Sequence, residues 1–162
     1  MERQQEELKR RFNYEAWRHQ QSAPEEQRRI RDISLTGIEL PDWTPQRIQR
    51  MTSKDFPPYV RSIWQRRDTG TESLIHVDLY ECDSIEAARE FLLRLLGEFQ
   101  SNKIERREGT LGDVTFVYAG LTMVLFSRTN VVVWLRNAGP EAVPVTSLAQ
   151  AFDMYLLSLL AR

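Results

Sequence analysis

The sequence predicts an α+β domain in which amphipathic helices pack on a mainly antiparallel β-sheet, preceded by a helical arm. Residues 121–136 indicate two strands joined by a tight turn at residues 128–130, and both faces of these strands are apolar. A strand that is apolar on both faces is covered on both faces, so this hairpin should lie in the middle of the sheet. Amphipathic patterns over residues 83–100 and 145–160 predict the two helices that cover it.

An arm of two helices should precede the sheet. Residues 2–21 form a polar helical pattern with favourable charge pairs four positions apart. A second helix should begin at Pro24, a residue suited to the first helical turn, and end near Arg31. The apolar stripe of the first helix is short and has two further aromatic residues beside it: Leu8, Phe12, Ala16, Tyr14 and Trp17. We therefore divide the chain into an arm, residues 1–31, and a single domain, residues 32–162.

Three strands should follow the arm. Alternating apolar residues predict strands over residues 33–40, 59–67 and 74–82. Pro41 should end the first of them, and Trp43 should begin a polar link to the second.

The first covering helix should begin at a capping box, with Asp83 at the N-cap and Glu86 three positions later. It should end near Gln100. Its apolar residues follow helical spacing: Ala88, Phe91, Leu92, Leu95, Leu96 and Phe99.

A short charged strand over residues 104–108 should lie at an edge of the sheet, where Arg106 and Arg107 would discourage further pairing. Residues 113–118 should form the strand that leads into the central hairpin. The last helix should begin at Val145 or Ser147.

This order of elements resembles the Mog1/PsbP-like modules, to which DcrB-like domains belong. The resemblance covers about residues 33–160. It rests on the opening Pro41-Asp42-Trp43, on paired strands, one helix, a four-strand meander and a C-terminal helix. It implies a non-catalytic accessory or assembly module.

Composition limits the function classes. The 162 residues suit one domain plus an appendage. A single cysteine excludes an internal disulfide, and two histidines with one cysteine cannot form a conventional zinc site. Residues 1–67 carry 14 Lys and Arg against 10 Asp and Glu, a net charge of +4, and residues 68–162 carry 8 against 13, a net charge of −5. The chain is therefore an acidic body with a mildly basic N-terminal part.

The N-terminus lacks the apolar region of a signal peptide, and no apolar run approaches the ~20 residues that span a bilayer. We therefore expect a soluble and cytoplasmic protein.

Cys82 and His76 are the residues that could form a nucleophile and its base. They are six positions apart on one predicted strand, which separates their Cα atoms by about 20 Å. Carboxylates at Asp78, Glu81 and Asp83 could hold a cation or act as acid and base, but Asp83 is already explained as a helix cap.

The sequence contains no glycine-rich phosphate loop and no G-x-S-x-G motif. Asp113 is explained as a turn residue. We therefore expect no catalytic, cofactor-binding or metal-binding residues, and we expect that the chain is not an enzyme.

Basic runs at residues 9–11, 28–31 and 66–67 could contact phosphates, but acidic residues are interleaved with them. A nucleic-acid-binding domain usually has a clear basic excess, whereas this chain has a net charge of −1. Weak binding of nucleic acid by the arm stays an alternative.

The arm is the predicted contact surface. Its stripe is too thin to hold it firmly on a sheet whose faces the two later helices already cover, yet its aromatic residues need cover. Leu8, Phe12, Tyr14 and Trp17 are the predicted partner-binding residues, since aromatic side chains dominate interface energetics. The predicted function is a non-enzymatic interaction, assembly or accessory module that docks through the arm on a partner protein or a second copy.

Two alternatives remain open from the sequence. The arm could pack on its own sheet. The chain could also be a small-ligand-binding domain, with an apolar pocket between sheet and helix.

Overall fold

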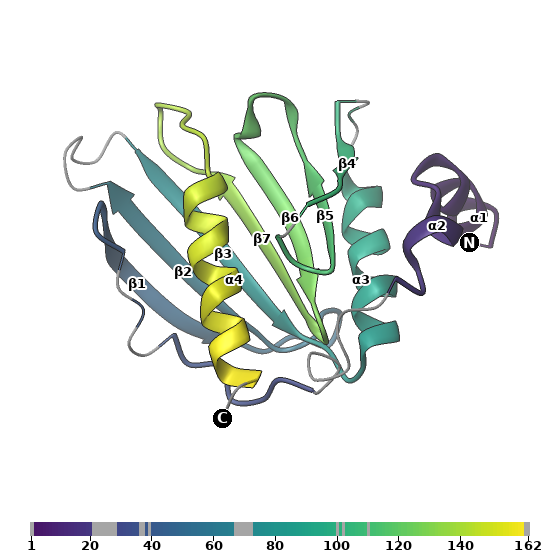
Figure 1. The fold of residues 1–162 in the computed structure, drawn as a ribbon, viewed down its shortest axis with the longest axis horizontal. Helices are drawn as coiled ribbons and strands as arrows, with labels where there is room; N and C mark the ends of the chain where they lie inside the picture. Colours follow the sequence, from purple (N-terminus) through teal and green to yellow (C-terminus); the bar gives the residue numbers. More distant parts are fainter. Residues whose placement is uncertain are drawn as a thin grey trace.

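The computed structural model describes residues 2–20, 29–35, 38, 40–66, 73–99, 101, 103–109 and 111–160. Within these residues seven strands form one sheet in the order β1-β2-β3-β7-β6-β5-β4, and all neighbours are antiparallel (Figure 1). The strands are β1 (Trp43–Met51), β2 (Tyr59–Arg66), β3 (Leu74–Glu81), β4 (Glu105–Arg107), β5 (Val114–Val117), β6 (Met123–Arg128) and β7 (Val131–Asn137). The helices are α1 (Glu2–Arg11), α2 (Tyr14–Trp17), α3 (Ile85–Glu98) and α4 (Thr146–Leu160), with a 3-10 turn at Ala119–Leu121. This confirms the predicted α+β fold with its N-terminal helical arm.

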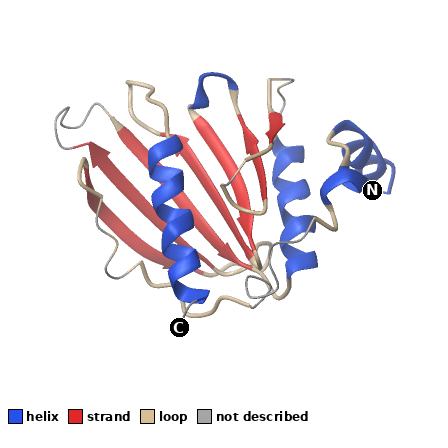
Figure 2. Cartoon of the chain, viewed as in Figure 1, coloured by secondary structure: helices blue, strands red, loops and turns tan. Residues whose placement is uncertain are grey.

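The central hairpin is covered on both faces, as predicted. β7 is the fourth of the seven strands and pairs with β6. Val131, Val133 and Leu135 belong to the core that contains the buried residues of α4, whereas Val132 belongs to the core that contains those of α3. Figure 2 shows both helices lying outside the sheet, with α4 in front of it. Two hydrophobic cores, one on each face, therefore hold the described parts together.

The two residues between β6 and β7 form a buried turn. Thr129 has a φ of 50°, and neither Thr129 nor Asn130 is exposed to solvent. The Asn130 side chain accepts a hydrogen bond from the Ile30 amide at 2.6 Å and donates to the carbonyl oxygens of Ile30 and Cys82 at 3.0 and 2.9 Å. Burial of such a turn requires these bonds, because an unsatisfied buried polar group costs free energy.

Helix α3 begins one residue later than predicted. Ser84 is the N-cap, and its Oγ accepts a hydrogen bond from the Ala87 amide at 3.0 Å. Asp83 is instead exposed and forms a 3.5 Å ion pair with Arg29. A serine hydroxyl caps a helix as well as a carboxylate does. The sequence Asp83-Ser84 is therefore compatible with an N-cap at either residue.

The first predicted strand was placed wrongly. Residues 31–35, 38 and 40 are not in a strand, and the first strand is β1, where a polar link was expected. The apolar side chains of Ile33 and Leu35 are buried in the α4-side core from a loop. β1 was not predicted from the sequence because it is an edge strand whose residues 45–50 are all exposed. Its sequence therefore does not alternate between apolar and polar residues.

The predicted single helix over residues 2–21 is broken. Its break lies at Asn13, which has a left-handed conformation with φ 54° and ψ 50°. The Trp17 indole donates to the Phe12 carbonyl oxygen at 2.9 Å, which satisfies the backbone at the break. The second predicted arm helix lies mostly outside the described residues, and residues 29–31 are not helical.

In the described part of the chain, none of the helices combines the length and the apolar character needed to span a bilayer.

Truncation of the α3 side of the core should be costly. Leu95 is 3% exposed, so Leu95→Ala should lower the free energy of unfolding by about 2–5 kcal/mol, through lost burial and a residual cavity. Chemical denaturation measures the change, and Lys103→Ala, an exposed site, is the control. Equal stability of the two variants would show that Leu95 is not part of the core.

Candidate functional site

The N-terminal arm packs on the domain through its aromatic residues. Phe12, Tyr14 and Trp17 are 8%, 5% and 0% exposed and belong to the same core as α3. The rings of Phe12 and Trp17 contact Phe116 of β5 edge to face, with centroids 6.0 and 5.4 Å apart. The premise that the arm's stripe is too thin to hold it on the domain is therefore wrong. The break at Asn13 turns two further aromatic side chains into the core.

Polar bonds hold the arm at two places. After α2 the Arg89 guanidinium of α3 donates to the carbonyl oxygens of Trp17, at 2.6 Å, and Gln20. The Gln20 side chain donates to the Asp113 carbonyl oxygen at 2.6 Å. At the end of α1 Arg11 donates to the Ser101 carbonyl oxygen at 2.6 Å. These bonds join the arm to three parts of the domain.

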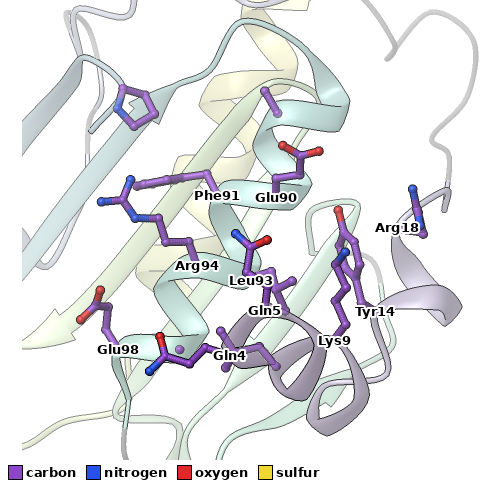
Figure 3. Close-up of a pocket in the computed structure, with 14 residues that line it drawn as sticks. Gln4, Gln5, Lys9, Tyr14, Arg18, Glu90, Phe91, Leu93, Arg94 and Glu98 are labelled. Atoms are coloured by element: carbon purple, nitrogen blue, oxygen red, sulfur yellow. The ribbon is translucent and has the colours of Figure 1, made fainter. Parts of the chain in front are cut away.

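A groove of about 840 Å³ lies between the arm and α3 (Figure 3). Its apolar lining includes Leu8 from α1 and Phe91 and Leu93 from α3. Charged residues line both of its sides: Lys9 and Arg18 on the arm, and Glu90, Arg94 and Glu98 on α3. Gln4, Gln5, Tyr14, Pro57, Ala87 and Gly97 complete the lining. The groove thus has a lining in which apolar and charged side chains are mixed.

The arm and α3 approach each other closely where Leu8 meets Gly97. A Cβ atom at Gly97 would lie 2.7 Å from Leu8 Cδ1, so a side chain there would require Leu8 to move. The loop before β2 borders the groove through Pro57. Arg94 holds that loop, since it donates to the Asp55 carbonyl oxygen at 2.6 Å and lies 5.0 Å from the Phe56 ring centroid.

Several charges along the groove have partners within the chain. Lys9 pairs with Glu6 at 3.6 Å and Arg18 with Glu15 at 2.9 Å. Burial, with the neighbouring Glu90 carboxylate, raises the pKa of Tyr14. The Tyr14 phenol is therefore protonated at neutral pH and can donate a hydrogen bond.

Four buried charged residues, from α3, the residue before β5, the end of β6 and α4, contact one another. Arg128 forms a bidentate pair with Asp153 of α4, with both N–O distances 2.8 Å, and pairs with Asp113 at 3.1 Å. Asp113 also accepts a hydrogen bond from the Thr129 amide at 2.7 Å and lies 3.8 Å from Arg89. We call Arg89, Asp113, Arg128 and Asp153 the ion cluster. It has no net charge.

Asp78 is paired on the α3 side of the sheet. This fully buried carboxylate accepts two bonds from Arg61 at 3.0 and 3.2 Å, and Arg136 lies at 3.1 Å. The Tyr80 hydroxyl donates to it at 3.4 Å. Burial, with the Arg136 charge nearby, lowers the pKa of His76. Two guanidinium groups occupy the Asp78 carboxylate, so its role in this arrangement is to hold β2, β3 and β7 together.

Cys82 is buried at 2% exposure, and burial, with Asp83 and Glu81 nearby, raises the pKa of its thiol to about 12. The thiol is therefore protonated at neutral pH and is a poor nucleophile. Among the described residues, no three His, Cys, Asp or Glu side chains are grouped so that they could hold a metal ion.

The four predicted partner-binding residues fall into two pairs. Leu8 and Tyr14 line the groove, and Tyr14 is also a core residue, whereas Phe12 and Trp17 are buried in the core and do not line the groove. A direct role of all four in partner binding stays a prediction. The division of the chain at residue 31 also stays a prediction, because residues 21–28, which join the two parts, lie outside the described residues.

The α3 side of the groove was missed from the sequence. Glu90, Arg94 and Glu98 follow one another at intervals of four on the polar face of the helix, which is the ordinary pattern of a solvated surface. Gly97 was the available signal of a contact on this side of the helix, because a glycine within a helix often lies where another segment packs closely.

Comparison with models of protein families, with curated proteins and with solved structures gave no match to this chain. The resemblance to Mog1/PsbP-like modules therefore stays a prediction.

The packing of the arm can be tested at Trp17. Trp17→Ala should lower the free energy of unfolding by about 3–5 kcal/mol, because the indole is fully buried. His19→Ala, an exposed site in the same segment, should change it by less than about 0.5 kcal/mol. Denaturant titration measures both. A stable Trp17→Ala variant would show that the arm is not held in the core.

The ion cluster should be sensitive to loss of one member. Asp153→Ala should lower the free energy of unfolding by about 3–5 kcal/mol, because it removes one of the two acids that pair with buried Arg128. The double variant Arg128→Met with Asp153→Leu should be less destabilised than Asp153→Ala. It removes the Arg128 charge as well, so no guanidinium at residue 128 is left with an acid missing. A double variant that is the less stable of the two would contradict this account.

Proposed function

We propose that this chain is a non-enzymatic interaction module that binds a partner protein in the groove between the arm and α3. The observation that carries the proposal is the composition of the groove, whose lining combines the apolar side chains of Leu8, Phe91 and Leu93 with charged ones from the arm and from α3. Protein interfaces combine apolar contacts at their centre with a polar rim, and this lining supplies both kinds of side chain. Charges at the rim contribute orientation and rate of association more than affinity.

The lining supports binding rather than catalysis. Its residues include no histidine, cysteine or serine, so the lining lacks a Ser–His or Cys–His pair. The titratable residues that do line it are Lys9, Tyr14, Arg18, Glu90, Arg94 and Glu98. Lys9 and Arg18 are paired with acids of the arm, and the Tyr14 phenol is held in its protonated form.

A small apolar ligand is the second candidate. The groove volume of about 840 Å³ falls within the range of about 300–1,000 Å³ that small-molecule sites occupy. The groove lies between two helical segments rather than between sheet and helix. Nucleic-acid binding by the arm is less well supported, because Lys9 and Arg18 pair with glutamates and Arg11 is bonded to Ser101.

Charge reversal at the margin of the groove tests the proposal. The groove variant carries Glu90→Lys and Glu98→Lys, both at exposed sites of α3. The control variant carries Glu105→Lys and Glu141→Lys, exposed sites outside the groove lining, so both variants change the net charge by the same amount. We expect the groove variant to lose a protein that co-purifies with the unchanged chain and with the control, as quantified by mass spectrometry.

Circular dichroism and thermal melting should first show that both variants are folded. If both retain the same co-purifying protein, the contact lies elsewhere. If native mass spectrometry instead detects a retained small molecule that only the groove variant loses, the ligand-binding alternative replaces the proposal.

A further inference from the structure

The segment of β1 and β2 carries the positive charge of the N-terminal part of the chain. Residues 43–67 contain six Lys and Arg against one acid, Asp55, which is a net charge of +5. Residues 1–42, which include the arm, contain 8 Lys and Arg against 9 Asp and Glu, a net charge of −1. The basic excess of the first 67 residues therefore belongs to these two strands and not to the arm.

β1 is an open edge of the sheet. Its neighbour is β2 alone, and residues 45–50 are all exposed. In the described part of the chain, β2 is the only segment that pairs with the backbone of residues 45–51. A bulge interrupts the pairing after Pro45, but from Arg47 to Met51 it is continuous. The outward backbone groups of this stretch are therefore available to a further strand.

The two edges of the sheet differ in length and charge. At the other edge, β4 is three residues long, and its two arginines lie 3.6 and 4.0 Å from the neighbouring carboxylates of Glu108 and Glu105. β1 is nine residues long and contains no acid. A short edge with paired charges discourages a further strand, whereas a longer edge with charges of one sign favours an added strand of the opposite sign.

The arginines of β1 keep their charge uncompensated. Arg47 is exposed, and no ion pair joins it to another described residue. The exposed Arg50 donates to the Ile33 carbonyl oxygen at 2.9 Å, a bond that supplies no negative charge. Side chains three positions apart on a strand point to opposite faces of the sheet. A partner strand with acids three positions apart can therefore place one acid beside each arginine.

We propose that the edge of β1 binds an extended acidic segment of a partner protein, which adds to the sheet as a strand beside residues 47–51. Main-chain hydrogen bonds hold the segment, and its carboxylates pair with Arg47 and Arg50. Ile48, which is 45% exposed, supplies an apolar contact between them. Figure 1 shows β1 at one edge of the sheet, with α3 and the arm at the other. This surface is separate from the groove, whose lining contains no residue of β1 or β2.

The charge of the edge selects the occupant. A second copy is disfavoured, because pairing β1 with β1 brings the arginines of both copies together. Nucleic acid complements the charge but not the open backbone edge. A long polyanion would also extend over the rest of the chain, which contains 16 Lys and Arg against 22 Asp and Glu outside residues 43–67. A short acidic strand complements both the edge and the charge.

Fluorescence anisotropy with labelled probes and the full chain tests the inference. The probe is a peptide as long as β1, in which Thr-Glu-Val is repeated three times. We expect it to bind saturably, and we expect its Lys counterpart, Thr-Lys-Val repeated, to bind about tenfold more weakly because two charge pairs are lost. The acidic peptide with every backbone nitrogen methylated keeps its charge but cannot donate, so it should also bind more weakly.

Three results with these probes would overturn the inference. The first is an absence of saturable binding by the acidic peptide. The second is equal binding of the methylated and unmethylated peptides, which would show that charge alone is recognised. The third is tighter binding of a labelled oligothymidylate than of the acidic peptide, which would assign the edge to nucleic acid.

Variants locate the contact. Arg47→Gln with Arg50→Gln should weaken binding of the acidic peptide about tenfold, and Arg47→Gln alone, which keeps the Arg50 bond to Ile33, about threefold. The control, Arg3→Gln with Arg107→Gln, changes the net charge equally at exposed sites and should bind as the unchanged chain does. Thermal melting should show that all the variants are folded. Equal binding by Arg47→Gln and the control would contradict the inference.

Discussion

The ion cluster is the constraint on which the arrangement of the helices depends. Arg128 at the end of β6 is bonded to Asp153 of α4 and to Asp113 at the start of β5. Asp113 lies in turn beside Arg89 of α3, which donates to the carbonyl oxygens of Trp17 and Gln20 in the arm. One set of buried charges therefore links both covering helices, the sheet and the arm. Displacement of any one of these parts would leave a buried charge uncompensated, which is costly.

This constraint also determines the groove. Arg89 fixes the end of α2 against α3, and Leu8 on Gly97 fixes the spacing of α1 from the same helix. Burial lowers the pKa of Arg89, and the Asp113 carboxylate opposes this shift. An arginine side chain stays protonated in proteins, so the guanidinium can donate to the arm. These two contacts therefore fix the position of the arm relative to α3, and so the width of the groove between them. A binding surface on rigid elements loses less entropy when it is occupied.

The sequence predicted the elements in which buried apolar residues recur with a regular period. The double apolar pattern of β6 and β7 and the helical spacing of α3 and α4 follow from their positions in the cores. Elements without such a period were missed. β1 is an exposed edge strand, and residues 33–40 alternate although Ile33 and Leu35 cover the sheet from a loop. The ion cluster was missed because Arg89, Arg128 and Asp153 are far apart in the chain, and a buried charge looks the same as a solvated one in sequence.

The two covering helices differ in the face that they present outwards, and the difference suggests a division of roles. α3 exposes charges and borders the groove, whereas α4 exposes an uncharged stripe, and the two helices lie on opposite faces of one sheet. The groove lining includes residues of α1, α2 and α3 and none of α4, so a partner bound in the groove would leave α4 uncovered.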